Sequence, residues 1–148
     1  MAEETAAQPA KKERKRKPKV FVARGKRKRA IARASISAGS GVITYNGENV
    51  SSLENPFVKQ ILLEPVEIAG GSGAFDIKVW SNGGGMMGQA QAGRTAIARA
   101  LVQFGGDALL KKKFLERDRS LLVEDARRVE PKKFKGPKAR ARFTKSYR

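Results

Sequence analysis

The stretch of sequence that decides the fold runs from residue 75 to residue 104 and reads FDIKVWSNGGGMMGQAQAGRTAIARALVQF. Apolar and polar side chains alternate from Phe75 to Trp80, which is the period of a half-buried strand. Three glycines at 83–85 then interrupt the chain, and apolar residues fall on one helical face between residues 86 and 104. The stretch therefore predicts a strand, a turn and a long helix whose alanines allow close packing.

Elements of the same kinds are predicted on both sides of this stretch. We expect a strand that begins at 20–22 and continues at 30–37, a second strand at 42–45, and helices at 56–69 and 107–117. The basic cluster Arg24–Arg29 is expected to interrupt the first strand, and Pro65 to kink or end the first helix. The predicted fold class is α+β, with a small sheet and helices packed on one face of it.

The glycine motif GGGMMG at 83–88 fits the G-x-G-x-x-G pattern of dinucleotide-binding turns. Three observations count against a nucleotide site. Only two helices and a basic tail follow the motif, Asp107 begins a helix where a second strand should end, and the chain is too short for a second mononucleotide-binding half. Glycines at a helix start also let backbone N–H groups approach an RNA phosphate, so Gly84 and Gly85 are candidate phosphate contacts.

Charge is unevenly distributed along the chain, which has 148 residues and a formal net charge of +18. Residues 1–29 have a net charge of +9, residues 30–110 of −1 and residues 111–148 of +10. Positive charge in this excess opposes compaction unless a polyanion neutralises it, so nucleic acid or an anionic surface is the leading partner. A nearly neutral middle with two basic arms predicts a body that sits on a surface and arms that penetrate it.

Three regions follow from this composition. Residues 1–19 are expected to form a basic extension that is disordered in the free protein, because they lack large apolar side chains. Residues 20–126 are expected to form the globular body. Residues 127–148 are expected to form an extended basic tail, in which Phe134, Phe143 and Tyr147 can stack on unpaired bases. The alternative for the last region is a disordered tail without a target.

The composition also excludes several classes of protein. Histidine and cysteine are both absent, which removes Ser-His-Asp and Cys-His catalysis, zinc sites built on these side chains, and disulfides. No apolar run approaches the roughly 20 residues of a membrane span, and the N-terminal residues lack the apolar segment of a secretory signal. Carboxylates, lysines and hydroxyls are the chemistry that remains for an enzyme, and a chain without disulfides fits the cytoplasm. We expect a binding protein with no catalytic residues, no metal and no cofactor.

Individual basic residues have more than one interpretation. The cluster GKRKR at 25–29 favours anion binding, because crowded like charges beside strands are unfavourable without counter-charge. Arg94 lies close to the apolar face of its predicted helix. Two interpretations of this position remain, a buried salt bridge and a phosphate contact. Arg99 lies on the polar side of the same helix and is interpreted as solvated.

Five motifs in order resemble one known family. They are GKRKRAIARA at 25–34, ITYNG at 43–47, GGGMMGQAQAGRTAIARAL at 83–101, FLERDRSLLVEDARRVEPKKF at 114–134 and GPKARARFTKSYR at 136–148. Over about residues 20 to 148 the chain resembles the universal ribosomal protein of the small subunit numbered nine, in its archaeal and eukaryotic form. The resemblance implies a structural RNA-binding protein of the head of the small ribosomal subunit, with an unusual left-handed βαβ crossover in its fold.

The resemblance also implies partners and contact residues. The partners are small-subunit ribosomal RNA, neighbouring proteins of the head, and the anticodon stem-loop of the tRNA in the P site. Residues expected to bind ribosomal RNA are Lys26, Arg27, Lys28, Arg29, Arg33, Gly84, Gly85, Arg94, Arg127, Arg128, Lys132, Lys133, Lys135, Arg140 and Arg142. Residues expected to bind tRNA are Lys145, Ser146, Tyr147 and Arg148. The rival functions are a nucleotide-dependent enzyme that uses the glycine motif and a general nucleic-acid compactor.

Overall fold

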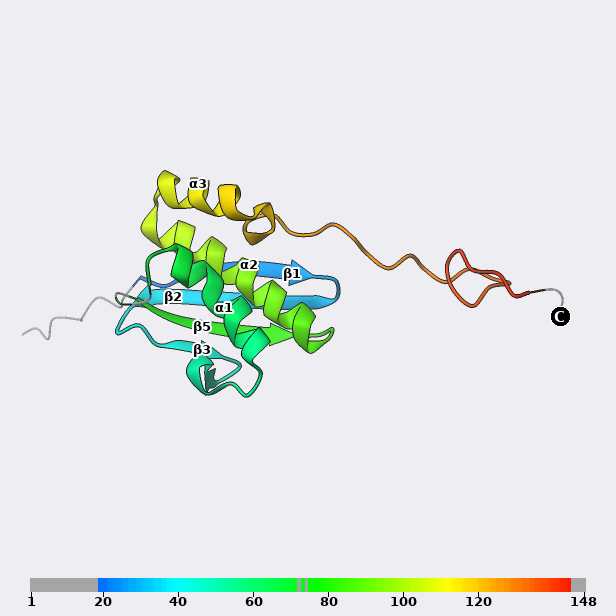
Figure 1. Cartoon of the computed structure of the whole chain (residues 1–148), viewed down its shortest axis with the longest axis horizontal. Coiled ribbons are helices and arrows are strands. Elements are labelled where there is room, and N and C mark those ends of the chain that lie inside the picture. The colour runs from blue at the N-terminus through cyan, green and yellow to red at the C-terminus, as the bar shows by residue number, and fades with distance from the viewer. Residues whose placement is uncertain (1–18, 72, 74, 145–148) are drawn as a thin grey trace, which may run out of the picture.

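The computed structural model describes residues 19–71, 73 and 75–144. These residues form one five-stranded mixed sheet in the order β1-β2-β5-β3-β4, with helices on one face (Figure 1). The strands are β1 (Phe21–Arg27), β2 (Ala30–Ala38), β3 (Ile43–Tyr45), β4 (Glu48–Asn49) and β5 (Phe75–Asn82). The helices are α1 (Pro56–Ile68), α2 (Met86–Gly105), α3 (Ala108–Arg117) and the short 3-10 helices η1 (Val50–Ser52) and η2 (Arg119–Leu121). The predicted α+β class is confirmed.

The topology of the sheet contains the crossover that the family resemblance implied. β1 and β2 form an antiparallel hairpin, β2 pairs antiparallel with β5, and β3 pairs parallel with β5. The connection from β3 to β5 passes through α1, which lies in front of the sheet in Figure 1. Both strands run to the right in this view and β5 lies above β3, so the crossover is left-handed, the rare hand for parallel strands.

The core lies between the sheet and α2, where small side chains bring the two layers close together. Ala32 and Ala34 of β2 and Ala92 and Ala96 of α2 are fully buried. A Cβ atom built on Gly25 of β1 would lie 2.1 Å from the carbonyl oxygen of Ala92. The predicted close packing of α2 is therefore present, and its contact with β1 requires a glycine.

The second face of the sheet carries no helix in the part of the chain that the structure describes (Figure 1). Side chains of a strand alternate between the two faces, and those of Arg24, Arg33 and Trp80 are exposed on this one. The sheet thus buries one face against α1 and α2 and leaves the other open. None of the helices in the described residues has the length and hydropathy needed to cross a membrane.

Two predicted interruptions take a different form in the structure. The basic cluster does not interrupt a single strand, because β1 continues to Arg27, and Lys28 and Arg29 form the turn into β2. Lys28 has a positive φ of 54°, as tight hairpin turns require. Pro65 does not end α1, which continues to Ile68. Pro65 lies in the last turn of this helix and is fully buried, so packing offsets the one hydrogen bond that proline removes.

A carboxylate of β5 holds the turn that follows β2. Oδ1 of Asp76 accepts hydrogen bonds from the backbone N–H groups of Ser40, Gly41 and Val42 at 2.9, 3.0 and 3.0 Å. These bonds, the one from Val42 foremost, hold the pKa of Asp76 below its usual value. The negative charge of Asp76 therefore stabilises the turn after β2, at one end of the sheet.

The tail leaves the body after η2 and extends far from the sheet, as predicted (Figure 1). Residues 130–142 of the tail close into a loop, the tail loop, that no sequence signal indicated. Glu130 accepts hydrogen bonds from Nε and Nη2 of Arg140 at 3.0 and 2.7 Å, and Arg142 donates to the carbonyl oxygen of Phe134 at 3.1 Å. Glu130 is the only acidic residue after Asp125, so its pairing with an arginine ten residues later determines where the loop closes.

Candidate nucleic-acid interface

The basic turn between β1 and β2 lies beside the glycine turn that precedes α2. A Cβ atom built on Gly83 would be 3.0 Å from the carbonyl oxygen of Arg29, and one built on Gly84 would be 3.0 Å from the backbone nitrogen of Ala30. Both glycines have positive φ, 76° and 68°, so this turn suits residues without a Cβ atom. The fold therefore brings two candidate sites, which are far apart in the sequence, to the same end of the body.

The first turn of α2 is open to solvent at this end. Gly85 is the N-cap residue, no side chain there hydrogen-bonds the first N–H groups, and a Cβ atom built on it would meet no atom within 4 Å. The first N–H groups of a helix lack intrahelical acceptors and attract anions. Gly85 thus has the free approach that a phosphate contact needs.

Positive charge is concentrated beside this helix start. Lys28 and Arg29 are exposed, and neither forms an ion pair with any other described residue. Arg29 also lines one groove together with tail residues 129–132 and 137–141. The turn, the helix start and the beginning of the tail therefore lie toward the right-hand end of the body in Figure 1, which we call the basic end.

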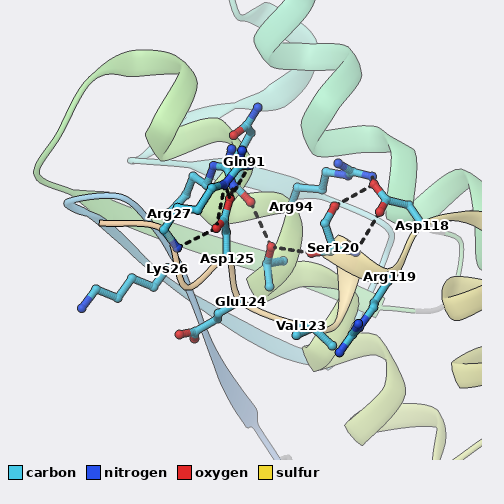
Figure 2. Close-up of a pocket in the computed structure, with 12 residues that line it drawn as sticks. Lys26, Arg27, Gln91, Arg94, Asp118, Arg119, Ser120, Val123, Glu124 and Asp125 are labelled. Carbon is cyan, nitrogen blue, oxygen red and sulfur yellow. Dashed lines mark hydrogen bonds and ion pairs between the residues drawn. The ribbon is translucent and has the colours of Figure 1, made fainter. Parts of the chain in front are cut away.

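A cavity of about 460 Å³ lies between β1, α2 and residues 118–127 (Figure 2). At its rim Asp125 forms ion pairs with both Arg27 and Arg127, the latter at 2.6 Å. Charges of both signs line the cavity and pair with one another, so they hold the start of the tail against the body. Among the residues that the structure describes, no cluster of acidic side chains is placed to hold a metal ion.

Arg94 forms an internal ion-pair network beside the same cavity. Its guanidinium lies 2.7 Å from Glu64 of α1 and 2.7 Å from Asp118, and its side chain is only 16% exposed. Hydrogen bonds from Ser120 and the nearby Arg94 guanidinium lower the pKa of Asp118 to about 2. Of the two roles open for Arg94, the structure favours the salt bridge, because two carboxylates already neutralise the charge that would attract a phosphate.

The family of this chain is evident from its similarity to known proteins. The family model described as ribosomal protein S9/S16 matches residues 25–148. The chain belongs to the ribosomal protein S9/S16 family. The relatives that the chain resembles include proteins of archaea named small ribosomal subunit protein uS9. The protein of Halobacterium salinarum is 50% identical over 126 residues, which cover 84% of this chain and 96% of the relative. The protein of Methanothrix thermoacetophila is 45% identical over 131 residues, which cover 88% of this chain and 99% of the relative. The protein of Methanococcus vannielii is 47% identical over 129 residues, which cover 84% of this chain and 95% of the relative.

Membership of the S9/S16 family confirms the resemblance drawn from the five motifs. The chain is a structural protein of the small ribosomal subunit, located in the cytoplasm as part of the ribosome, and it is not an enzyme. The nucleotide-dependent enzyme is therefore excluded as an alternative. GGGMMG in this family member forms the glycine turn at 83–85 and the first residues of α2, and it packs against the β1–β2 hairpin.

Arg99 has a structural role in this S9/S16 protein that no sequence signal indicated. It donates hydrogen bonds to the carbonyl oxygens of Leu122 and Arg24 at 2.9 and 2.7 Å and to the carboxylate of Glu124 at 2.8 Å. These bonds tie α2 to β1 and to the segment from which the tail begins. The interpretation of Arg99 as a solvated residue is wrong, because a lone arginine on the polar side of a helix does not reveal contacts to distant segments.

The other predicted contact residues lie in several places. Arg33 is on the open face of the sheet, where Arg24 is its cross-strand partner. The half-buried Lys26 lies near the hairpin turn. All the predicted contact residues of the tail that the structure describes are exposed, namely Arg127, Arg128, Lys132, Lys133, Lys135, Arg140 and Arg142. Arg140 and Arg142 also have partners within the tail loop. Lys145, Ser146, Tyr147 and Arg148 lie outside the described residues.

Proposed function

We propose that this S9/S16 family member binds ribosomal RNA in the head of the small subunit with its basic end. The observation that supports this most strongly is the position of Lys28 and Arg29, unpaired among the described residues, beside the open first turn of α2. Side-chain cations supply attraction to the phosphates, and backbone N–H groups at a helix start donate hydrogen bonds to the same oxygens. Gly84 and Gly85 allow that approach.

The tail extends the proposed interface beyond the body. Two aromatic side chains interrupt its run of exposed cations, and these residues, Phe134 and Phe143, are 86% and 65% exposed. Such aromatics stack on unpaired bases, while lysines and arginines neutralise the backbone. Arg127 and Arg27, which share Asp125, hold the start of the tail at the basic end. Neighbouring proteins of the head are further partners that we propose on the basis of the family resemblance.

Replacing both Lys28 and Arg29 with glutamine is expected to weaken binding of the full chain to small-subunit ribosomal RNA by about five- to thirtyfold near physiological salt. The physical reason is the loss of two contacts to phosphates. Each lost contact should also reduce the slope of log affinity against log salt by about 0.7–0.9. Filter binding at several salt concentrations measures both quantities.

A matched control removes the same charge elsewhere. Lys112 and Lys113 are exposed on α3, and replacing both with glutamine should change the affinity much less than the hairpin variant does. Equal losses in the two variants would mean that only net charge matters. Wild-type binding to random duplex DNA as tight as to ribosomal RNA would favour the general compactor instead.

The end of the tail contacts the anticodon stem-loop of the P-site tRNA in this proposal. Its support is the motif GPKARARFTKSYR at 136–148 and the match of the family model through residue 148. The motif assigns the contact to Lys145, Ser146, Tyr147 and Arg148. The tail loop, closed by Glu130 and Arg140, lies immediately before these residues.

Ending the chain at Thr144 is expected to lower the affinity of assembled small subunits for P-site tRNA by about tenfold, the effect of losing one or two charge-assisted contacts. This truncation keeps the Glu130–Arg140 pair, so the tail loop should persist. tRNA binding is measured on subunits whose assembly has first been checked by sedimentation. Normal assembly with unchanged tRNA affinity would show that the last four residues are not the tRNA contact.

A further inference from the structure

The open face of the sheet carries a set of side chains that the proposed basic end does not use. Strand register places Arg24, Arg33 and Trp80 in one row across β1, β2 and β5. The flanking rows contain Val22, Ser35 and Lys78 on one side, and Lys26, Ile31 and Asn82 on the other. Residues paired in this way project from the same face of a sheet, so the three rows form one continuous surface.

The charge on this surface is positive. No acidic residue occurs in the three rows, and neither Arg33 nor Lys78 forms an ion pair with another described residue. Two carboxylates lie at the margins. Asp76 caps the turn after β2, and Glu124 lies 3.9 Å from Arg24 but also binds Arg99 at 2.8 Å. The surface therefore attracts an anion and would repel a basic partner.

An aromatic ring lies in the middle row of this positive surface, on β5. Trp80 is 61% exposed, and its Cη2 atom is 4.0 Å from a Cβ atom built on Gly47, in the turn between β3 and β4. Val22 and Ile31 are 61% and 42% exposed on the same face. A large aromatic ring among free cations combines the two features by which proteins hold single-stranded nucleic acid, a stacking platform and backbone neutralisation.

We propose that an unpaired base of the ribosomal RNA stacks on Trp80, while Arg33 and Lys78 contact the phosphates that flank it. The inference rests on the proposed binding of ribosomal RNA and adds a second contact surface to it. Arg33 lies directly opposite Trp80 across the strands, and Lys78 lies two residues before it on the same face. Directly opposed side chains are about 5 Å apart and diagonal or i±2 neighbours about 7 Å apart, so both cations reach a nucleotide stacked on the ring.

Trp80 is the only tryptophan in the chain, so its emission reports directly on this surface. Titration of the full chain with small-subunit ribosomal RNA should change that emission and saturate at the RNA concentration at which filter binding saturates. Trp80→Ala should weaken RNA binding about fivefold or more, and Trp80→Phe, which keeps a stacking ring, should retain most of the affinity. Arg33→Gln should lower the salt slope by about 0.7–0.9.

Two controls separate this inference from the proposed function. Trp80→Ala should melt close to the wild type, because the side chain is exposed and makes no core contact. The Lys28 and Arg29 double variant should bind RNA more weakly yet still show the emission change. If the wild type binds RNA without an emission change and Trp80→Ala binds equally well, the inference is wrong and the proposed function stands. If the wild type does not bind ribosomal RNA, both are wrong.

A protein partner would give a different result. If small subunits assembled with Trp80→Ala lose a neighbouring protein, while the RNA affinity of the isolated variant is unchanged, the open face is a protein interface and the stacking inference is overturned.

Discussion

Replacing Gly25 with alanine is expected to lower the free energy of unfolding by about 3 kcal/mol or more. The added Cβ atom would lie 2.1 Å from the carbonyl oxygen of Ala92 and 2.7 Å from the backbone nitrogen of Ala96. Both atoms belong to the backbone of α2, which cannot turn aside as a flexible side chain does. The helix would have to move away from β1 along its contact with the sheet. A domain of ordinary stability loses a large share of its folding free energy by such a change.

Urea unfolding followed by circular dichroism measures this loss, with Gly85→Ala as the matched control. A Cβ atom on Gly85 meets no atom within 4 Å, and its φ of −117° suits any residue. Alanine is a poorer N-cap residue than glycine, so the free energy of unfolding of the control should fall by only about 0.5–1 kcal/mol. Similar losses in the two variants would contradict the direct contact between β1 and α2.

Removing the Arg94 guanidinium should have the second largest effect. Arg94→Met is expected to lower the free energy of unfolding by about 2 kcal/mol. The methionine would leave Glu64 and Asp118 facing each other without the cation that now lies 2.7 Å from both. Breaking a fully buried pair costs about 3–5 kcal/mol. A smaller loss is expected here because the two carboxylate side chains are 30% and 39% exposed and water partly solvates them.

The same variant distinguishes the two roles that the sequence left open for Arg94. Adding Glu64→Gln and Asp118→Asn to Arg94→Met should recover part of the stability, because the uncompensated charges are then gone. Measured under conditions in which Arg94→Met is folded, ribosomal RNA affinity should equal that of the wild type. A normal free energy of unfolding together with weakened RNA binding would instead identify Arg94 as a phosphate contact.

Much of the fold was predictable from local pattern. The alternation at Phe75–Trp80 and the helical spacing after Gly85 correspond to β5 and α2, and both elements are present. The hairpin was harder to predict, because the charges of Arg24–Arg27 obscure the continuation of β1 and only the positive φ of Lys28 makes the turn. β4 has two residues, which is too few for any periodicity to reveal.

The candidate site was predictable only in part. A run of cations and a glycine turn before a helix are visible in the sequence, and both suggest phosphate. Their adjacency is not visible, because it depends on the antiparallel pairing of β2 with β5, which places Ile31 opposite Asn82 and so brings Arg29 beside Gly83. The partners of Arg94 and Arg99 come from α1 and from the segment after α3. In the sequence, Trp80 is only one position in the alternating pattern of a strand.

By itself, the amino-acid sequence determined the kinds of elements in this protein, its two basic arms and its lack of histidine and cysteine chemistry. These properties depend on each residue and its near neighbours in the chain, which is why periodicity and composition reveal them. Only the tertiary structure decided which cations remain free for a polyanion and which are neutralised internally. That distinction depends on strand register, the left-handed crossover and the close contact of α2 with Gly25. All three arise from packing between segments that are distant in the sequence.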